Sequence, residues 1–500
     1  MAEKGKFYSG TLYELNGKSV DYKAEIQFDE ISQCLVKIYD VEREWLEKLR
    51  DSENNHALIR LNEGEFFTIL YFYVKRGAGR LQYEYDKPKR TGFDLTIMSS
   101  NVIRGSKGFP LEYKFSEMCM EITDGHELIG KCPYDLKSGY MEMAMYKNIN
   151  IPIVIEPIYV STTLGTFIFE TLPQYFWDRE SLNIGLSHKI IYKPTEPLRV
   201  NEFYKTLNKI TDFFSLLSGE TITINKLELI ESKKEQFDSY KFVGYCNFPK
   251  EKLNVLENGG IDATSFKRVS LFKLTDFSNL GHAMDYWFEH YSALYNAQQA
   301  YGRILLDEDV KVITINKFLA AMQMIEGYSQ AFVNEEQEIA KFNMQKQSIM
   351  DQLEDEADKE LVKKGLGFSG ISFRRALTNY FFEAIQYFTQ ISKTAFNKKY
   401  DDLLENILND RNLYTHSSNQ ISAKLDFSEA MEISGLCKEL YRALVLTKMG
   451  MSESVLCHRF SHNRTTTALF SNLLYFNIRI DGESTVFDND MRCFSDDKME

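Results

Sequence analysis

Proline is missing from the second half of this 500-residue chain: all nine prolines lie between Pro88 and Pro249. Proline breaks helix interiors but fits turns and strand edges, so its absence after Pro249 predicts a helical second half and a different first half. The chain also lacks a positive charge balance, because its formal net charge is −13. A protein that coats nucleic acid through overall charge is usually basic, so any such contact here should be local.

Disulfide, zinc and membrane signals are equally scarce. The seven cysteines are odd in number and form no CxxC pair, which favours reduced thiols over a disulfide framework. The nearest approach to a zinc site is Cys457, His458 and His462, and no second ligand pair follows it. The N-terminus has no apolar stretch of signal-peptide length, and no run approaches a membrane span. We therefore expect a cytoplasmic protein with no membrane contact, no metal and no cofactor.

The first half consists of short alternating or β-branched runs. The hydrophobic fraction of 44% is enough for large cores, and the length predicts two or three domains. Gly, Asp, Asn and Pro separate the runs, which therefore read as strands of a mostly antiparallel sheet. One stretch at residues 200–219 has helical spacing and a glycine stop at Gly219. The predicted strands lie at residues 19–28, 66–74, 93–105, 151–170 and 220–230.

The second half has helical periodicity almost throughout. Short connections between such helices predict an antiparallel bundle. The overall prediction is an α+β protein with a β-rich domain at 1–255, a linker at 256–269, an all-α bundle at 270–450 and an irregular tail at 451–500. The predicted helices span residues 284–306, 314–333, 373–392, 398–416 and 427–450.

Basic residues gather in one part of the bundle. Between Lys359 and Lys399 there are eight basic side chains and only two acidic ones, Glu360 and Glu383. One interpretation is a solvated face with loop lysines, the usual meaning of a run of like charge. The other is a local phosphate-binding patch, which needs only a few positive groups near its site.

The segment "RNLYTH" follows this basic stretch and pairs Arg411 with His416. RNA cleavage without a metal needs a group that can transfer a proton near neutral pH, and histidine suits this best. It also needs a fixed cation to hold the phosphate, a task for which arginine has a planar fork that stays charged. Asn412 could orient either group through its amide.

Two considerations keep other interpretations open. On an ideal helix Arg411 and His416 lie about 140° apart, so both reach one cleft only if the helix bends or a second subunit closes the site. Taken alone, His416 is a structural or surface histidine, and Arg411 forms a surface ion pair with Asp410 or Glu405. Glu326 interrupts an otherwise apolar helix, and a buried carboxylate there would need a partner such as Arg411.

In the form R-N-x-x-x-H, "RNLYTH" resembles the signature of HEPN-domain ribonucleases. A β-rich, proline-bearing half followed by a helical bundle resembles ApeA-type bacterial anti-phage proteins, and "FYSGTLYELNGK" resembles the start of their N-terminal domain. The resemblance implies an endoribonuclease that cleaves RNA, with tRNA one candidate substrate, by metal-independent acid–base chemistry. Arg411 would hold the phosphate, His416 would transfer the proton and Asn412 would position the pair.

The resemblance also implies partners: a second copy of the chain in a homodimer or higher homo-oligomer, and a phage-encoded trigger sensed by the N-terminal half. The products would be 2′,3′-cyclic phosphate and 5′-hydroxyl ends, and cleavage on infection would be abortive for the host cell. The main alternative is a non-catalytic HEPN-type scaffold that dimerises through the bundle. A further alternative is silencing of the motif by modification of Tyr414, and the last is that the motif is coincidental.

Overall fold

The computed structural model describes most of the chain and bears out the α+β prediction. The described residues are 6–28, 34–42, 45, 49, 55–84, 87–99, 101–109, 112–131, 155–177, 182–233, 236–242, 272–309, 314–332, 335–365, 372–385, 393–416 and 422–461. Two compact units result: Met1–Phe214 with Ile222–Thr275, and Ser215–Thr221 with Asp276–Glu500. The predicted linker at 256–269 lies outside the described residues, so its boundaries stay a prediction.

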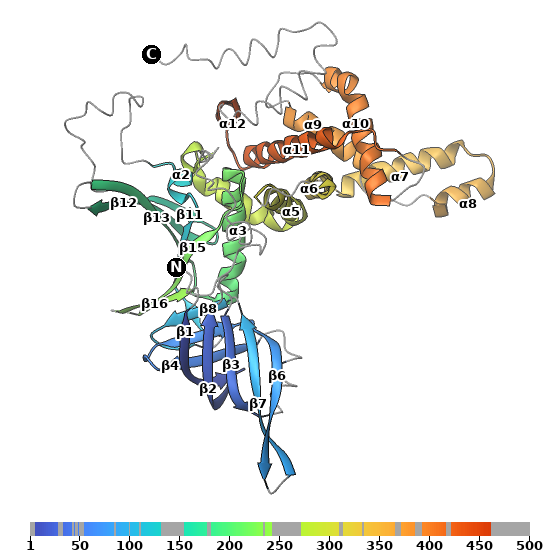
Figure 1. The fold of residues 1–500 in the computed structure, drawn as a ribbon. Helices are drawn as coiled ribbons and strands as arrows, with labels where there is room; N and C mark the ends of the chain where they lie inside the picture. The colour runs from blue at the N-terminus through green and yellow to red at the C-terminus, as the bar shows by residue number, and fades with distance from the viewer. Residues whose placement is uncertain are drawn as a thin grey trace. The chain divides into compact units, whose positions relative to one another are not determined.

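The first unit is built on a 14-stranded sheet whose neighbouring strands run antiparallel (Figure 1). Its order is β11-β12-β13-β10-β15-β16-β8-β5-β4-β1-β2-β3-β7-β6, and a separate two-stranded sheet pairs β14 with β9. The strands are β1 (Phe7–Leu15), β2 (Lys18–Phe28), β3 (Cys34–Val41), β4 (His56–Leu61), β5 (Phe66–Leu70), β6 (Tyr73–Glu84), β7 (Lys87–Ser99), β8 (Asn101–Gly105), β9 (Lys114–Phe115), β10 (Glu117–Ile122), β11 (Ile158–Thr162), β12 (Gly165–Trp177), β13 (Leu182–Pro194), β14 (Leu198–Arg199), β15 (Ile224–Lys233) and β16 (Gln236–Phe242).

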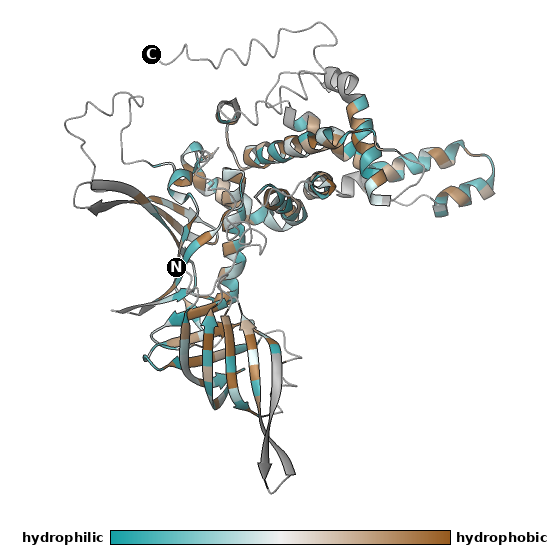
Figure 2. Cartoon of the chain, viewed as in Figure 1, coloured by the Kyte–Doolittle hydropathy of each residue, from teal (hydrophilic) through white to brown (hydrophobic). Residues whose placement is uncertain are grey.

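Alternation along the strands explains why they form. In β2, Ala24, Ile26 and Phe28 are buried while the residues between them are exposed, and Figure 2 shows this alternation of hydropathy on the neighbouring strands. A strand with period two buries one face against the core. The buried faces of β1 to β8 share one hydrophobic cluster, which includes Val36 and Ile97.

Three predicted strands turn out to be divided, because the described part of the run at residues 151–170 also separates into β11 and β12. Residues 66–74 read as one run, but β5 ends at Leu70 and Tyr71 has a φ of 52°. A bulky residue in the left-handed region marks a sharp change of chain direction, which periodicity does not reveal. Residues 93–105 likewise divide into β7 and β8. The predicted helix is confirmed as α3 (Val200–Ser218), and Gly219 follows it with a φ of 73°.

The second unit is helical. The helix α6 (Ile315–Ala331) contacts α5 (Leu280–Asp309), α9 (Phe373–Ile385), α10 (Lys393–His416) and α11 (Phe427–Lys448). All five correspond to predicted helices. Gly327 allows the close approach of α6 to α5, because a Cβ there would lie 2.7 Å from the backbone nitrogen of Ala297. The rest of the regular structure that is described comprises α2 (Gly125–Ile129) in the first unit, the short helix η2 (Leu274–Asp276) at the boundary of the two units, and α7 (Glu335–Gln352), α8 (Glu356–Gly365) and α12 (Glu453–Ser461) in the second unit.

None of these five helices was predicted, and α7, α8 and α12 lie in the helical unit. No helix was predicted for α7 and α8, which pack against each other and carry exposed apolar residues such as Met344 and Leu361. Their weak apolar periodicity explains the omission, since α8 buries none of its residues. The tail at 451–500 was expected to be irregular, and this is wrong for its start, because α12 occupies Glu453–Ser461. The remainder, from residue 462, lies outside the described residues.

Arg442 is the most deeply buried cation of the helical unit. It is 2% exposed and lies on α11, which is buried on all sides from Ile433 to Leu446. Its Nε donates to the Leu216 carbonyl at 2.7 Å, its Nη2 donates to the Leu217 carbonyl at 2.6 Å, and its Nη1 donates to Glu439 at 2.8 Å. Arg442 therefore caps the last turn of α3, whose final carbonyls lack helical partners.

Charges around Arg442 form a connected network. Lys438 donates to Glu308 at 2.7 Å and lies 3.2 Å from Glu439. Burial opposes ionisation of Glu439, but Arg442 and Lys438 outweigh it and lower the pKa of that carboxyl. Burial likewise opposes the charge of Lys438, yet Glu439 and Glu308 raise its pKa overall. Each charge is thus retained because its partners are also buried.

Replacing Arg442 with methionine should strongly destabilise the helical unit. The substitution leaves two α3 carbonyls and the buried Glu439 carboxylate without their cation, a loss of about 3–5 kcal/mol in the free energy of unfolding. Urea denaturation followed by circular dichroism measures it. Arg303→Met on α5 is the matched control, because Arg303 is exposed. A loss below about 1 kcal/mol for Arg442→Met would contradict the assigned role.

Acid should destabilise the first unit through His188 on β13. His188 is 7% exposed, and its Nε2 accepts a hydrogen bond from the Ile122 amide at 2.8 Å. Burial, with a smaller contribution from His126, lowers the pKa of His188 to about 4 from its ordinary 6.5. The contribution of neutral His188 to the free energy of unfolding is complete above pH 6.5 and is lost as pH falls toward 4. The loss is about 2 kcal/mol by pH 5. The melting temperatures of the wild type and His188→Gln, measured between pH 7 and pH 5, should approach each other as the pH falls. A difference in melting temperature that stays constant across this range would refute the role of His188.

Candidate active site

Arg411 lies near the C-terminal end of α10 and is held by neighbours on three sides. Its Nη2 donates to Glu326 Oε1 on α6 at 2.5 Å, and its Nη1 donates to Asn412 Oδ1 at 3.2 Å. The guanidinium also lies over the ring of Phe373 on α9, 5.0 Å from the ring centroid. An arginine gripped through a carboxylate, an amide and an aromatic face has little rotational freedom left.

The partner of Arg411 differs from the two carboxylates suggested for it by local spacing. Glu405 instead pairs with Arg374 on α9. Asp410 is 1% exposed and accepts the backbone amides of Lys424 and Leu425. The observed partner, Glu326, is 85 residues away in the sequence. Arg411 was one candidate partner for Glu326, beside the expectation of an exposed or structurally paired carboxylate; the two residues do pair, and Glu326 is 32% exposed rather than buried.

The other motif residues are placed by the same helix. Asn412 contacts Arg411 directly, as the spacing suggested. His416 is the last residue of α10, and its side chain lies outside what the structure describes, as do those of Cys457 and His458, while His462 lies beyond the described residues. Tyr414 packs edge-on against Phe318 of α6, with ring centroids 6.3 Å apart. The structure thus brings Arg411 and Asn412 together, and the place of the His416 imidazole stays a prediction.

The electrostatics of this site are local. The opposite charges of Arg411 and Glu326 make the pair neutral overall. Arg411 is 22% exposed and Glu326 is 32% exposed, so the pair is accessible to solvent. Among the described residues, Glu326 and Asn412 are the hydrogen-bond partners of the guanidinium, which has five N–H groups in all. Donors therefore remain for a phosphate oxygen that approaches from the solvent side.

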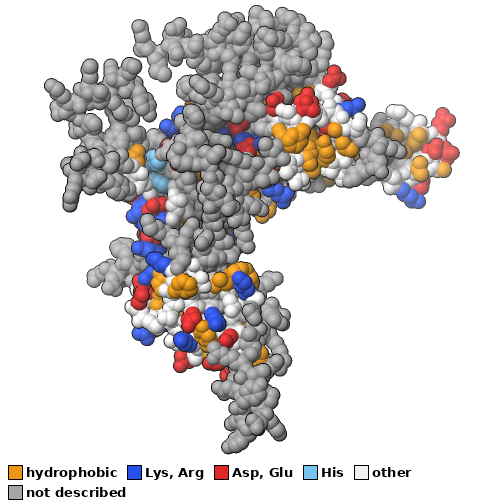
Figure 3. All heavy atoms as spheres, in the orientation of Figure 1, with side chains coloured by type: hydrophobic (Ala, Val, Ile, Leu, Met, Phe, Trp, Pro, Cys, Tyr) orange, Lys and Arg blue, Asp and Glu red, His pale blue; other side chains and the backbone are white. Residues whose placement is uncertain are grey.

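The basic stretch that precedes the motif is partly neutralised. Lys359 pairs with Glu356 at 2.7 Å, and Lys364 pairs with Glu360 at 3.3 Å. On the face drawn in Figure 3, lysine and arginine side chains are interspersed with acidic ones. These pairs favour the interpretation of a solvated face over that of a continuous phosphate-binding patch. The side chains of Lys393, Lys398 and Lys399 lie outside the description.

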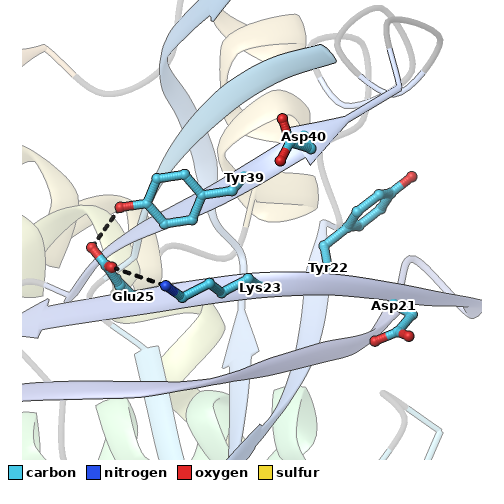
Figure 4. A pocket seen from close by; sticks show the side chains of 6 residues that line it. All are labelled: Asp21, Tyr22, Lys23, Glu25, Tyr39 and Asp40. Atoms are coloured by element: carbon cyan, nitrogen blue, oxygen red, sulfur yellow. Dashed lines mark hydrogen bonds and ion pairs between the residues drawn. The ribbon is translucent and has the colours of Figure 1, made fainter. Parts of the chain in front are cut away.

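A concave feature lies on the first unit, between β2 and β3. It is a hollow of about 500 Å³. Tyr39 donates to Glu25 at 2.5 Å, and Lys23 lies 3.9 Å from the same carboxylate (Figure 4). Three carboxylates against one ammonium would repel a phosphate, so RNA does not suit this hollow. Its lining consists of Asp21, Tyr22, Lys23, Glu25, Tyr39 and Asp40.

Comparison with known protein families agrees with this architecture. The ApeA N-terminal domain 1 matches residues 3–287, and the Apea-like HEPN domain matches residues 319–455. The chain therefore belongs to the ApeA family of HEPN proteins, a family of anti-phage defence proteins. The HEPN match begins inside α6 and ends inside α12, so it contains Glu326, Arg411 and His416.

More distant comparisons add nothing to this assignment. Neither the curated proteins nor the solved structures contain a match to the chain. Across the part of the chain that the structure describes, no helix is both long and apolar enough to cross a bilayer.

Removing the Glu326 carboxylate should hardly change stability. Both partners are about one-quarter to one-third exposed, so solvent screens their attraction, and Glu326→Gln should lower the free energy of unfolding by less than about 1 kcal/mol. The same urea titration measures it, and Glu405→Gln serves as the matched control on α10. A loss above about 3 kcal/mol would instead make the Arg411–Glu326 pair a structural element of the bundle.

Proposed function

We propose that the helical unit is a metal-independent HEPN endoribonuclease and that the chain is an anti-phage effector that acts by abortive infection. The observation that carries this proposal is the setting of Arg411, an accessible cation fixed by Glu326, Asn412 and Phe373. Membership of a HEPN family supports it, because HEPN domains are generally ribonucleases. A fixed guanidinium stabilises charge that develops on a phosphate during cleavage.

The reaction follows from the two motif side chains. His416 takes the proton of a ribose 2′-hydroxyl, and the 2′-oxygen attacks the adjacent phosphorus. The bond from phosphorus to the 5′-oxygen breaks, that oxygen takes a proton from water, and the imidazolium of His416 returns its proton to solvent, so the strand is cut by transesterification. Arg411 binds the non-bridging oxygens throughout, and Asn412 keeps the guanidinium in place. The products are a 2′,3′-cyclic phosphate and a 5′-hydroxyl, and DNA is excluded because it has no 2′-hydroxyl.

Glu326 has a positioning role in this reaction. Its carboxylate fixes one edge of the guanidinium from a different helix, so the cation does not depend on α10 alone for its direction. It also neutralises Arg411 in the resting protein, which limits attraction of unrelated anions. The bound RNA has to share the guanidinium with Glu326 rather than replace it, since Arg411 offers donors on more than one edge.

Assembly and triggering complete the proposal. A homodimer or higher homo-oligomer would bring two motifs together and so remove the difficulty of the 140° separation on one helix. The first unit would restrain the ribonuclease until it meets a phage-encoded trigger, and tRNA is one candidate substrate. The scaffold alternative makes the same structural demands but predicts that RNA remains intact.

Purified full-length protein should cut RNA in a way that depends on His416 and Arg411. With a 5′-labelled RNA in EDTA, His416→Ala should reduce the cleavage rate at least 100-fold because it removes the proton acceptor, and Arg411→Ala should do the same. Arg411→Lys should recover little, because an ammonium lacks the planar fork. Gel electrophoresis with end-group analysis measures rate and product ends.

The matched controls are His282→Ala and Arg303→Ala, which change exposed side chains on α5 and should leave the rate within twofold. An oligonucleotide with a single 2′-deoxy substitution should resist cleavage at that position. Activity that survives His416→Ala, or that disappears only on chelation, would overturn the proposed chemistry. Wild-type protection against phage with intact RNA would favour the scaffold.

A further inference from the structure

Asp410 is a buried carboxylate directly before Arg411 in the sequence. It is 1% exposed, and both of its oxygens accept backbone amides from the segment that follows α10. Lys424 N donates to Oδ1 at 2.7 Å, and Leu425 N donates to Oδ2 at 3.0 Å. The amide of Asn409 adds to the same contact, because its Nδ2 donates to Asp410 Oδ1 at 2.9 Å and to the Ser422 carbonyl at 3.0 Å.

The start of α11 does not explain this arrangement. That helix already has a complete capping box, in which Asp426 accepts the Glu429 amide and Glu429 accepts the Asp426 amide. A buried anion is expensive to desolvate, typically by several kcal/mol, and it persists where its hydrogen bonds hold something in place. Here they hold the chain before α11 against the side of α10.

The hydrogen bonds of Asn409 and Asp410 to residues 422–425, here called the tether, constrain the end of α10. From Asn409 to His416 the helix rises about 10 Å, at about 1.5 Å per residue. The chain leaves α10 after His416 and is back beside Asn409 at Ser422, where the hydrogen bond is 3.0 Å long. Asn409 and Asp410 therefore hold residues 422–425 against α10 within about two turns of its last residue. Arg411 directly follows Asp410, and His416 is the last residue of the helix.

We propose that Asp410 is a positioning residue that sets the end of α10 carrying His416 relative to Arg411. This inference rests on the proposed roles of those two residues. Asp410 takes no part in proton transfer, because it is buried and both oxygens are engaged by amides. It holds Lys424 and Leu425, and through them it limits fraying of the helix end. A frayed helix end would let Arg411 and His416 adopt many relative positions instead of one. Few of those positions would be reactive.

The test compares Asp410→Asn with Asp402→Asn, which removes the same charge from an exposed position on α10. An asparagine keeps one acceptor oxygen and turns the other toward an amide as an NH₂ group, so one tether bond is lost. Hydrogen exchange of the Lys424 and Leu425 amides should become at least tenfold faster. The RNA kcat should fall at least tenfold while KM stays within twofold, because Arg411 still binds the phosphate. Asp402→Asn should change neither.

The double variant Asp410→Asn with His416→Ala separates positioning from general loss of structure. Once His416 is absent, loss of its positioning should add less than twofold to the defect; a further tenfold fall would overturn the proposal. Should Asp410→Asn fail to fold, Asn409→Ala removes the hydrogen bonds to Ser422 and to Asp410 Oδ1 but keeps those from Lys424 and Leu425, and it should lower kcat about threefold. An inactive wild-type protein would refute the proposed ribonuclease activity but not the structural role of Asp410. Hydrogen exchange then tests that role alone. Exchange rates of the Lys424 and Leu425 amides that are unchanged in Asp410→Asn would overturn it.

Discussion

The helical unit depends on the buried guanidinium of Arg442. Without it, the last turn of α3 would end in carbonyls with no partner, and Glu439 would keep Lys438 as its single cationic neighbour among the described residues. Such a loss would cost several kcal/mol, comparable to the whole stability of many domains. Gly219 is part of the same arrangement, since a Cβ there would lie 2.6 Å from Arg442 Nη1. The cation therefore determines which residue can follow α3 as well as how α3 ends.

From Arg442 the constraint passes to the candidate active site through packed helices. Its helix, α11, contacts α6 and α9, and these two helices supply Glu326 and Phe373 to Arg411. The direction of the Arg411 guanidinium is thus set by α6 and α9, and its place along the chain by α10. A cation built in this way suits an acidic protein. Under the proposed function it would bind a phosphate through a few short contacts, without requiring a positive surface that would hold any nucleic acid.

Much of this architecture could be predicted from local patterns. Alternation identified β2, helical spacing and a glycine stop identified α3, and the absence of proline separated the two halves. The Arg411–Asn412 contact also followed from adjacency. A partner for Glu326 could be expected, because a carboxylate in an apolar helix needs one. Which residue it is depended on a contact between positions 85 residues apart. Periodicity carries no information about such a contact, since it reports which face is buried and not against what.

Other features were not predicted from the sequence, because their local signals compete with stronger ones. Asp410 looked like a surface partner for Arg411, yet the burial of its own turn directs it to the amides of Lys424 and Leu425. The helices α7 and α8 have polar sequences whose helicity comes from propensity and not from an apolar stripe. The strand break at Tyr71 required a backbone conformation that a tyrosine rarely adopts.

The neutral pairing of Arg411 with Glu326 limits what the site can bind. A guanidinium whose charge is already balanced gains little from distant Coulomb attraction, so under the proposed function its affinity for RNA would come from directed hydrogen bonds at short range. Such bonds depend on the position of the scissile phosphate to within a few tenths of an ångström. Selectivity would then reside in RNA shape near the cut and not in total charge.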